Sequence, residues 1–341
     1  MYVANRSNTR FSAVKITDVA AAAGVAPMTV SRVLNTPERV SPDTAARVLE
    51  AIETLGYVPN LIAGGLSSRR SRMIAAIVPT IASPMFHEPV QSFTDAMGRA
   101  GYHVMLALSG YGEADEATLV RAVLARRPDG LLLTGAHRTP AVQRLLATAH
   151  VPVVEMWDTA EHPTDMLVGL DHAEVGAEVA AFFAARGHTR FAFLGASDIR
   201  ATARRRGFEQ GVAAHGGTLV AARTVNAPGT ILDSREALRA MAPELTGRRT
   251  ALFASSDLVA FGAITEARLL GIEVPTQLAI CGFGDFELSR GASPAATTVH
   301  VDGTAMGLLA AKHLLARLAG HATAGVHRSL VPFHIIERET S

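Results

Sequence analysis

Cysteine is almost absent from this chain of 341 residues. Cys281 is the only one, so neither an internal disulfide nor a cysteine-rich zinc site can form, and we expect it to be a buried strand residue. The thirteen histidines include no HExxH pair. The chain also lacks a GxGxxG loop after a strand and a GxSxG nucleophile motif. These absences argue against a metalloenzyme, a dehydrogenase and a serine hydrolase, and we expect no catalytic residue, cofactor or metal.

Long apolar runs are missing as well. No run approaches the roughly 20 residues that a membrane-spanning helix needs. Residues 1–12 carry arginines and asparagines where a secretory signal would be apolar. We therefore expect a cytoplasmic protein that does not contact a membrane. Apolar residues make up 48% of the chain and aromatic residues 5%, which fits an α/β globular protein of two or three domains.

The net charge of +1 hides an asymmetry along the chain. Residues 1–72 hold nine lysines and arginines against five acidic residues, a net +4, and the remainder is net −3. A basic end on an otherwise slightly acidic chain indicates a segment that contacts nucleic acid.

Residues 15–35, KITDVAAAAGVAPMTVSRVLN, predict two short helices joined by a turn. In the first, residues 18–23 place Val19, Ala20 and Ala23 on one face, and Gly24 supplies the turn. In the second, residues 27–34, Val30, Val33 and Leu34 face inward, so the opposite face is free to meet DNA. Arg32 there can donate two hydrogen bonds to guanine. An ordinary helical pair with solvated polar residues is the alternative.

A third helix follows in VSPDTAARVLEAIETLGY. Ser41 is expected to cap it, with Val48, Ile52 and Leu55 as its buried stripe and Gly56 at its end. Residues 61–68 hold two adjacent glycines, which weaken a helix that is already short. They predict either a segment that folds only on DNA or a flexible linker.

These stretches resemble the headpiece and hinge of the LacI/GalR family of transcriptional repressors, and the similarity continues to the C-terminus. Within that family, the gluconate-utilisation branch is most similar in GYHVMLALSGY, PDGLLLTGAHRTP, VPVVEMWD and ARGHTRFAFLGA. The resemblance implies that the hinge helices of two copies insert a leucine, here Leu66, into the minor groove. The expected DNA-binding residues are Pro27, Met28, Thr29, Ser31, Arg32, Asn35, Ser41, Tyr57, Asn60, Ala63 and Leu66.

From residue 73 onward, apolar runs alternate with amphipathic helices, as in a doubly wound α/β fold. The runs expected as strands are MIAAIVP, YHVMLAL, GLLLT, VPVVEM, FAFLGA, TALFAS and LAICGF. The expected helices are residues 88–100, 113–126, 140–149, 173–186, 202–215, 234–241, 257–270 and 303–319. The resemblance implies that the chain has three parts: a helix-turn-helix headpiece (15–60), a hinge (61–72) and a periplasmic-binding-protein-like effector and dimerisation domain (73–341). Its two subdomains would be residues 73–170 plus 301–328 and residues 171–300 plus 329–341.

Ligands of such folds bind where strands end, which gives candidate residues before any resemblance is used. Asp171 is one of these candidate residues at the end of a strand. Ser256 and Asp257 could also cap a helix, Trp157 could be core or stack on a sugar, and Asp285 could merely start a turn. Arg204 shares an inward stripe with Arg200, Phe208 and Gly211, and the resemblance places it among effector contacts. The expected effector-binding residues are Ser83, Phe86, Thr134, Trp157, Asp158, Arg204, Ser256, Asp257 and Asp285.

Two positions depart from the family pattern. Gly284 stands where many sugar-binding members have an acidic residue, which favours an anionic ligand over a neutral sugar. Ala26 replaces the usual capping serine or threonine of the second helix, at a cost of ~1 kcal/mol that Pro27 partly offsets.

We therefore predict a homodimeric repressor that binds double-stranded operator DNA and is released by a small sugar acid such as gluconate. The alternatives are a family member with another effector or the opposite sign of coupling, and a sugar-binding protein or enzyme on the same fold. The operator sequence cannot be predicted, because Pro27 and Met28 offer no side-chain hydrogen bond at the positions that select it.

Overall fold

The computed structural model describes residues 14–58, 70–112, 116–136, 138–245, 247–320 and 327–341. The chain divides into two compact units, Met1–Ser71 and Arg72–Ser341. The predicted hinge residues 61–68, together with Asn60, Ala63 and Leu66, lie outside the described residues.

The first unit is a three-helix domain around a small apolar core. Its elements are α1 (Ile16–Ala23), α2 (Pro27–Asn35), the 3-10 turn η1 (Pro37–Arg39) and α3 (Pro42–Leu55). Gly24 and Gly56 end α1 and α3 in the left-handed conformation, with φ of 66° and 60°, as the sequence predicted. The predicted inward residues of α1 and α2 are buried or packed against this core.

The predicted buried stripe of α3 is wrong at one position. Leu55 is exposed, whereas Ala51 is buried beside Val48 and Ile52 packs against them. Leu55 is the last residue of α3, beyond the reach of α1 and α2. Ser41 occupies the N-cap position, but its hydroxyl donates to Thr44 Oγ1 at 2.9 Å and accepts no capping hydrogen bond from the backbone of α3.

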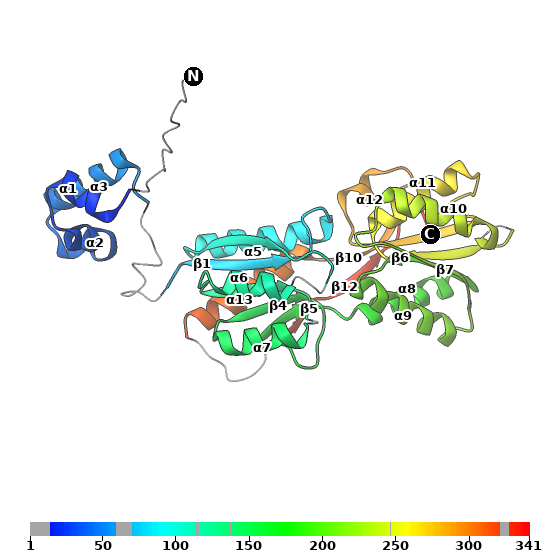
Figure 1. Cartoon of the computed structure of the whole chain (residues 1–341). Helices are drawn as coiled ribbons and strands as arrows, with labels where there is room; N and C mark the ends of the chain where they lie inside the picture. The colour runs from blue at the N-terminus through cyan, green and yellow to red at the C-terminus, as the bar shows by residue number, and fades with distance from the viewer. Residues whose placement is uncertain (1–13, 59–69, 113–115, 137, 246, 321–326) are drawn as a thin grey trace, which may run out of the picture. The chain divides into compact units, whose positions relative to one another are not determined.

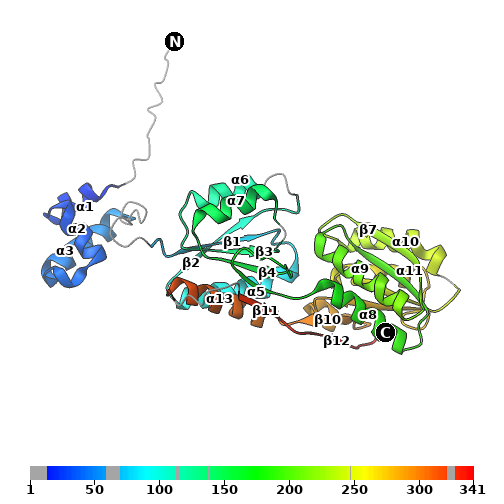
Figure 2. The same cartoon turned by 90° about the horizontal axis from the view of Figure 1, so that it is seen from below.

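The second unit begins with a parallel sheet in the order β11-β5-β4-β3-β1-β2. Helices α5 and α13 lie on one face of this sheet and α6 and α7 on the other (Figure 2). The strands are β1 (Met73–Val78), β2 (His103–Leu108), β3 (Gly130–Thr134), β4 (Val153–Trp157), β5 (Met166–Gly169) and β11 (His327–Leu330). The helices are η2 (Pro84–Phe86), α5 (His87–Arg99), α6 (Glu116–Leu124), α7 (Pro140–Ala149) and α13 (Gly303–Leu318). We call this sheet with its helices the first subdomain.

A second sheet, in the order β12-β10-β9-β8-β6-β7, is parallel except for the pair β10 and β12. Helices α10 and α11 cover one face and α8 and α9 the other (Figure 1). The strands are β6 (Arg190–Ala196), β7 (Thr218–Val225), β8 (Thr250–Ala254), β9 (Leu278–Phe283), β10 (Thr297–Val301) and β12 (Phe333–Ile336). The helices are α8 (His172–Ala185), α9 (Ile199–Ala214), α10 (Ile231–Leu245), α11 (Asp257–Leu269) and α12 (Glu287–Gly291). This is the second subdomain.

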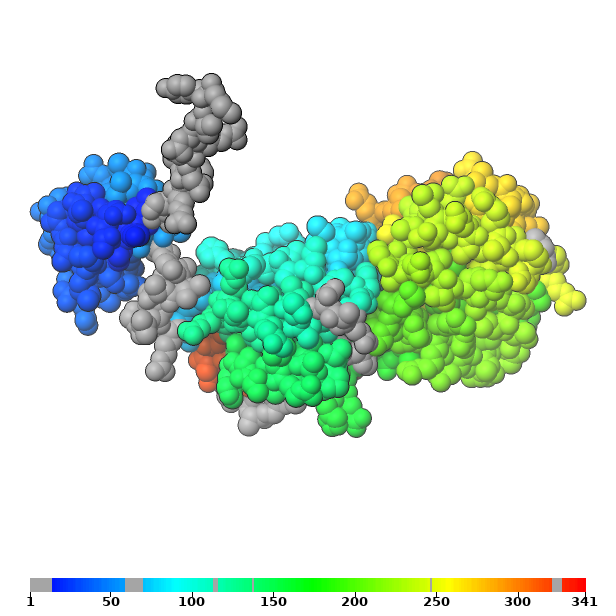
Figure 3. Space-filling view, viewed as in Figure 1, coloured from blue at the N-terminus to red at the C-terminus, as the bar shows by residue number. Residues whose placement is uncertain are grey.

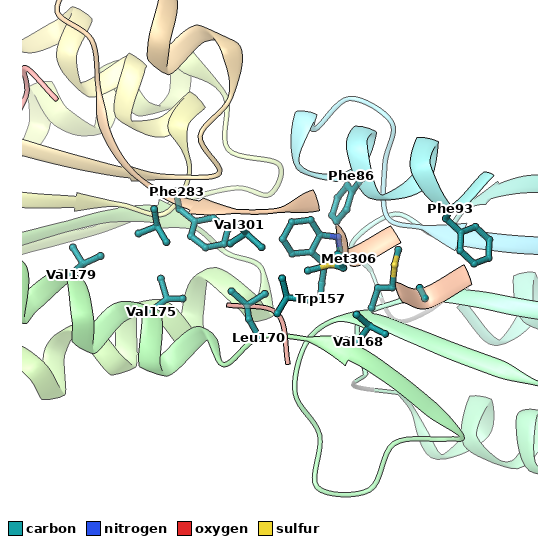
Figure 4. Close-up of a cluster of buried hydrophobic side chains, with 14 of the residues drawn as sticks. Phe86, Phe93, Trp157, Val168, Leu170, Val175, Val179, Phe283, Val301 and Met306 are labelled. Atoms are coloured by element: carbon teal, nitrogen blue, oxygen red, sulfur yellow. The ribbon is translucent and has the colours of Figure 1, made fainter. Parts of the chain in front are cut away.

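The chain crosses between the two subdomains near Leu170, Val301 and Val331. All three residues are buried in one hydrophobic cluster that continues from one sheet to the other. Figure 4 shows Leu170 and Val301 lying with Trp157 between the two halves of this cluster. The subdomains are therefore joined by apolar contacts at the same place as by the chain.

Seven strands were predicted and are present, but β5, β7, β10, β11 and β12 were missed. These are either four residues long or rich in polar residues, as in TTVHV of β10. Helix α10 extends to Leu245, beyond the predicted end before Pro243, because Leu245 is buried in the core under α11. Helix α9 begins three residues before the predicted start, because the Asp198 side chain caps it.

His188, which precedes β6, makes the stability of the fold depend on pH. Its ring is buried and lies edge-on to Phe183 at 5.4 Å. Burial, followed by the charges of Arg249 and Arg186, lowers the pKa of His188 from 6.5 to about 4. The unfolded chain binds this proton at higher pH, so the contribution of His188 to stability is complete above pH 6.5 and is lost as the pH falls toward 4.

We expect His188→Gln to unfold with a weaker pH dependence between pH 6.5 and 4. The difference from the native chain should reach at most about 3 kcal/mol across that window. Urea unfolding at both ends of the window measures it, with the exposed His103→Gln as control. Parallel pH profiles for the native chain and His188→Gln would contradict the assignment.

Candidate functional sites

The helix-turn-helix of the first unit presents a polar face on α2. Val30 and Val33 are buried, so Met28, Arg32 and Asn35 are exposed and Thr29 and Ser31 partly exposed on the other side. Asn35 Nδ2 donates to the Ser31 carbonyl oxygen at 2.8 Å and to Ser31 Oγ at 3.4 Å, which holds the two side chains together. Arg32 has no side-chain partner among the described residues, so its guanidinium is available to a DNA base edge.

The second helix begins as the sequence predicted. Ala26 is the N-cap and provides no side-chain cap, and Pro27 follows at the first helical position. Tyr57 is half-buried and packs against the core of this unit.

In the second unit, the two subdomains meet along a boundary that is visible on the molecular surface (Figure 3). A cavity of about 350 Å³ lies at this boundary. We call it the arginine cavity, because Arg200 and Arg204 of α9 line it. Its other lining residues include Ser83, Met85, Phe86, Tyr111, Asp198, Thr230, Ser255, Ser256, Leu258 and Phe286.

Arg204 is almost fully buried, with 1% of its surface exposed. It donates to His172 Nδ1 at 2.8 Å and to the Ser255 carbonyl oxygen at 2.9 Å, and its guanidinium carbon lies 4.1 Å from the centre of the Phe283 ring. Burial lowers the pKa of Arg204 to about 10, so the side chain stays charged at neutral pH. Its Nε has no partner among the described residues.

His172 is neutral in this setting. Burial, and then the charges of Arg204 and Arg200, hold the pKa of His172 well below 6.5. Because Nδ1 accepts from Arg204, the ring proton resides on Nε2. Nε2 lies 3.7 Å from Asp158 Oδ1.

A second cavity of about 580 Å³ adjoins the first, and we call it the outer cavity. Tyr111, Asp198 and Arg200 line both cavities. Thr134 and Asp158 line only the outer one, and the buried Thr134 Oγ1 has no hydrogen-bond partner within the part of the chain that the structure describes.

The structure thus brings Ser83, Phe86, Arg204 and Ser256 to the arginine cavity, and Ser256 also caps α11, the two roles the sequence left open. Trp157 belongs to the core, 3% exposed and edge-on to Phe86 at 6.2 Å, and it borders a third cavity together with Asp285. Asp171 caps α8 outside these cavities.

Two predicted carboxylates are engaged by the protein itself. Asp257 accepts from Thr298 Oγ1 at 2.5 Å and from Phe286 N at 2.8 Å, and it does not line the arginine cavity. Asp285 accepts from Arg338 at 2.5 Å and lies 3.0 Å from His300 Nδ1. Gly284 has φ of 125°, and a Cβ there would lie 2.4 Å from the Phe286 ring, so a side chain at this position would be strained and would require Phe286 to shift.

Sequence reasoning missed Tyr111, Asp198, Arg200, Thr230 and Phe286 as lining residues. Tyr111 follows β2, where the rule of strand ends applies. Arg200 was identified on the inward stripe of Arg204, and the structure confirms that both are buried. Helical spacing was therefore the signal for Arg200. Thr230 and Phe286 lie in loops that no simple pattern marks.

A helix-turn-helix unit followed by two parallel-rich sheets with a cavity between them defines a DNA-binding protein with a ligand-binding domain. Residues 15–60 match the bacterial regulatory proteins of the lacI family, and residues 180–341 match the periplasmic binding protein-like domain. The chain belongs to the lacI family and is a DNA-binding transcriptional regulator.

Similar proteins include the HTH-type transcriptional regulator GntR of Escherichia coli K12, 33% identical over 89% of this chain and 92% of the relative. GntR of Pseudomonas aeruginosa is also 33% identical, over 93% of each chain. A LacI-family regulator from Silicibacter pomeroyi has a solved structure with a TM-score of 0.89 and 30% identity, covering 96% of this chain and 99% of that one. The lac repressor dimer bound to operator shares the fold, with a TM-score of 0.81, 24% identity and coverage of 96% and 99%.

These relatives are transcriptional regulators. Regulators of this family bind operator DNA and small-molecule effectors and function as dimers. No helix in the described part of the chain is both long and apolar enough to cross a membrane.

Proposed function

We propose that this regulator is a homodimeric repressor of genes for sugar-acid catabolism, released from its operator by gluconate or a closely related sugar acid. The observation that carries the proposal is Arg204. Its guanidinium is charged and buried on the cavity wall, and its hydrogen bonds to described residues go to a neutral imidazole and a carbonyl oxygen. A buried charge without a bonded counter-ion is costly, and a carboxylate ligand offsets that cost with parallel hydrogen bonds.

The other side chains around the arginine cavity suit the remainder of a sugar acid. Ser83, Tyr111, Thr230 and Ser256 offer hydroxyl groups that can both donate to and accept from ligand hydroxyls. Phe86 and other apolar residues give the cavity a surface for carbon atoms. Among the described residues that line the cavity, Asp198 is the acidic one, and its carboxylate accepts from the backbone of Arg200 and Ala201 at the start of α9. The similarity to GntR regulators supports the same ligand class.

On the DNA side, one headpiece reads one half-site, so a symmetric dimer fits a pseudo-palindromic operator. Arg32 and its neighbours on α2 would contact base edges, and the hinge residues Ala63 and Leu66 would contact the minor groove at the centre of the operator. The effector would act by favouring the arrangement of the subdomains in which the two hinge segments separate.

The test is release of a labelled DNA duplex, selected by the full-length protein from a random library. We expect gluconate to lower the fluorescence anisotropy of the bound duplex at concentrations where glucose has no effect. Glucose has the same hydroxyl-rich carbon chain but no carboxylate. Equal release by glucose, or tighter DNA binding with gluconate, would contradict the proposed ligand or the proposed sign.

A further inference from the structure

Asp158 is held in place by the first subdomain. It directly follows β4, and its backbone packs against β5 so closely that a Cβ at Gly169 would lie 2.0 Å from the Asp158 carbonyl oxygen. Its carboxylate Oδ2 accepts from Ala136 N at 3.1 Å. With 4% of its surface exposed, Asp158 is a buried, positioned negative charge.

Arg200 and Arg204 are held in place by the second subdomain. Their helix α9 packs backbone to backbone on α8, because a Cβ at Gly176 would lie 2.0 Å from the Arg204 carbonyl oxygen. A Cβ at Gly207 would lie 1.8 Å from the Ala173 carbonyl oxygen. Helices that approach this closely cannot slide without clashes, so the two arginines move with α8 as one body.

A charged contact joins the two bodies. Arg200 Nη1 lies 3.4 Å from Asp158 Oδ1, and neutral His172 adds its Nε2 at 3.7 Å from the same oxygen. Gly135 lies directly against this pair, since a Cβ at Gly135 would lie 3.0 Å from Asp158 Oδ2 and 3.2 Å from Arg200 Nη1. This contact therefore responds directly to the relative position of the subdomains.

Arg200 also separates the two cavities. It lines both of them, whereas Asp158 lines only the outer cavity and Arg204 only the arginine cavity. An anion bound beside Arg204 would share the arginine cavity with the Arg200 side chain, whose guanidinium also pairs with Asp158. The anion and the Asp158 carboxylate then compete for the same positive charge.

We infer that Asp158 is an internal competitor of the anionic effector, pairing with Arg200 in the ligand-free protein and giving it up when the effector binds. The inference rests on the proposed function and adds how ligand binding is coupled to the subdomain boundary. If Asp158 were instead a direct contact of the ligand, its removal would have the opposite effect on ligand affinity. Removing a contact weakens binding, whereas removing a competitor strengthens it.

The test combines two measurements on the full-length protein. Asp158→Asn keeps the side-chain shape and an oxygen for Ala136 N but removes the charge. The matched control is Asp165→Asn, which removes an aspartate that pairs with Arg317 at 2.6 Å in the same subdomain, away from both cavities. Calorimetric titration with gluconate should show affinity raised by about fivefold or more in Asp158→Asn, the lower range for coupled sites, and unchanged in Asp165→Asn.

The second measurement needs no ligand. Trp157, the only tryptophan, directly precedes Asp158 at the boundary, so acrylamide quenching of its fluorescence reports opening there. We expect quenching to rise in Asp158→Asn and equally in Arg200→Gln, which removes the other partner, and not in Asp165→Asn. Weaker or unchanged gluconate binding in Asp158→Asn would overturn the inference and leave the proposed function intact. If acrylamide quenching rose in Asp158→Asn but the native protein bound no gluconate, the contact between Asp158 and Arg200 would be supported. The proposed ligand would then be rejected, and with it the competition.

Discussion

Arg204→Gln will lower the affinity for gluconate by about 30-fold or more, because losing one partner of a buried charge pair costs about 2–5 kcal/mol. Glutamine cannot reproduce the planar fork that binds a carboxylate, and it carries no charge. Operator binding should persist, but gluconate should no longer release the DNA. Calorimetry measures the first effect and fluorescence anisotropy of the labelled duplex the second.

The control for this prediction lies on the same helix. Arg206 is exposed, two residues after Arg204, so Arg206→Gln makes the same chemical change outside the cavity. Because Arg204 also bonds to His172 and Ser255, thermal unfolding of each variant must show that the fold is kept. A folded Arg204→Gln protein with native gluconate affinity would rule out Arg204 as the anion-binding residue.

Arg32→Ala will lower the discrimination between operator and mismatched DNA by about 1–3 kcal/mol, the value of a bidentate contact between arginine and guanine. The Arg32 side chain is exposed on the face of α2 opposite to the buried Val30 and Val33, and it has no competing partner among the described residues. Binding to random-sequence DNA should weaken much less, since the headpiece keeps its other basic groups.

Competition binding against mismatched duplexes measures this loss for each base pair. Arg47→Ala is a suitable control, because Arg47 is an exposed arginine on α3 and not on α2. Arg47→Ala should reduce the affinity for DNA evenly across DNA sequences. The same base preferences in the native chain and in Arg32→Ala would show that another residue reads the operator.

The headpiece followed from its sequence because every signal there is local. Gly24 and Gly56 end helices within a few residues of the apolar positions they follow. The missed strands depend on distant partners instead. Thr297 and Thr298 of β10 are fully buried although polar, since their hydrogen bonds go to Thr340 and Asp257, more than 40 residues away.

The same limit applied to the ligand site. The rule of strand ends found Ser83, Phe86 and Ser256, whose positions depend only on where a strand stops. It could not foresee that Asp285 would bond to Arg338, 53 residues later. Whether a carboxylate is available to a ligand depends on partners that only the folded chain supplies.

The close backbone contacts at Gly176 and Gly207 bear on how such a regulator could acquire a new ligand. Almost any side chain at either glycine would push α8 from α9 and displace both arginines. Ser83, Tyr111, Thr230 and Phe286 lie outside these two helices, so substitutions there can reshape the cavity while the arginines stay fixed. A biosensor designer would therefore randomise these four positions, keep the two glycines, and expect the resulting repertoire to consist mainly of acids.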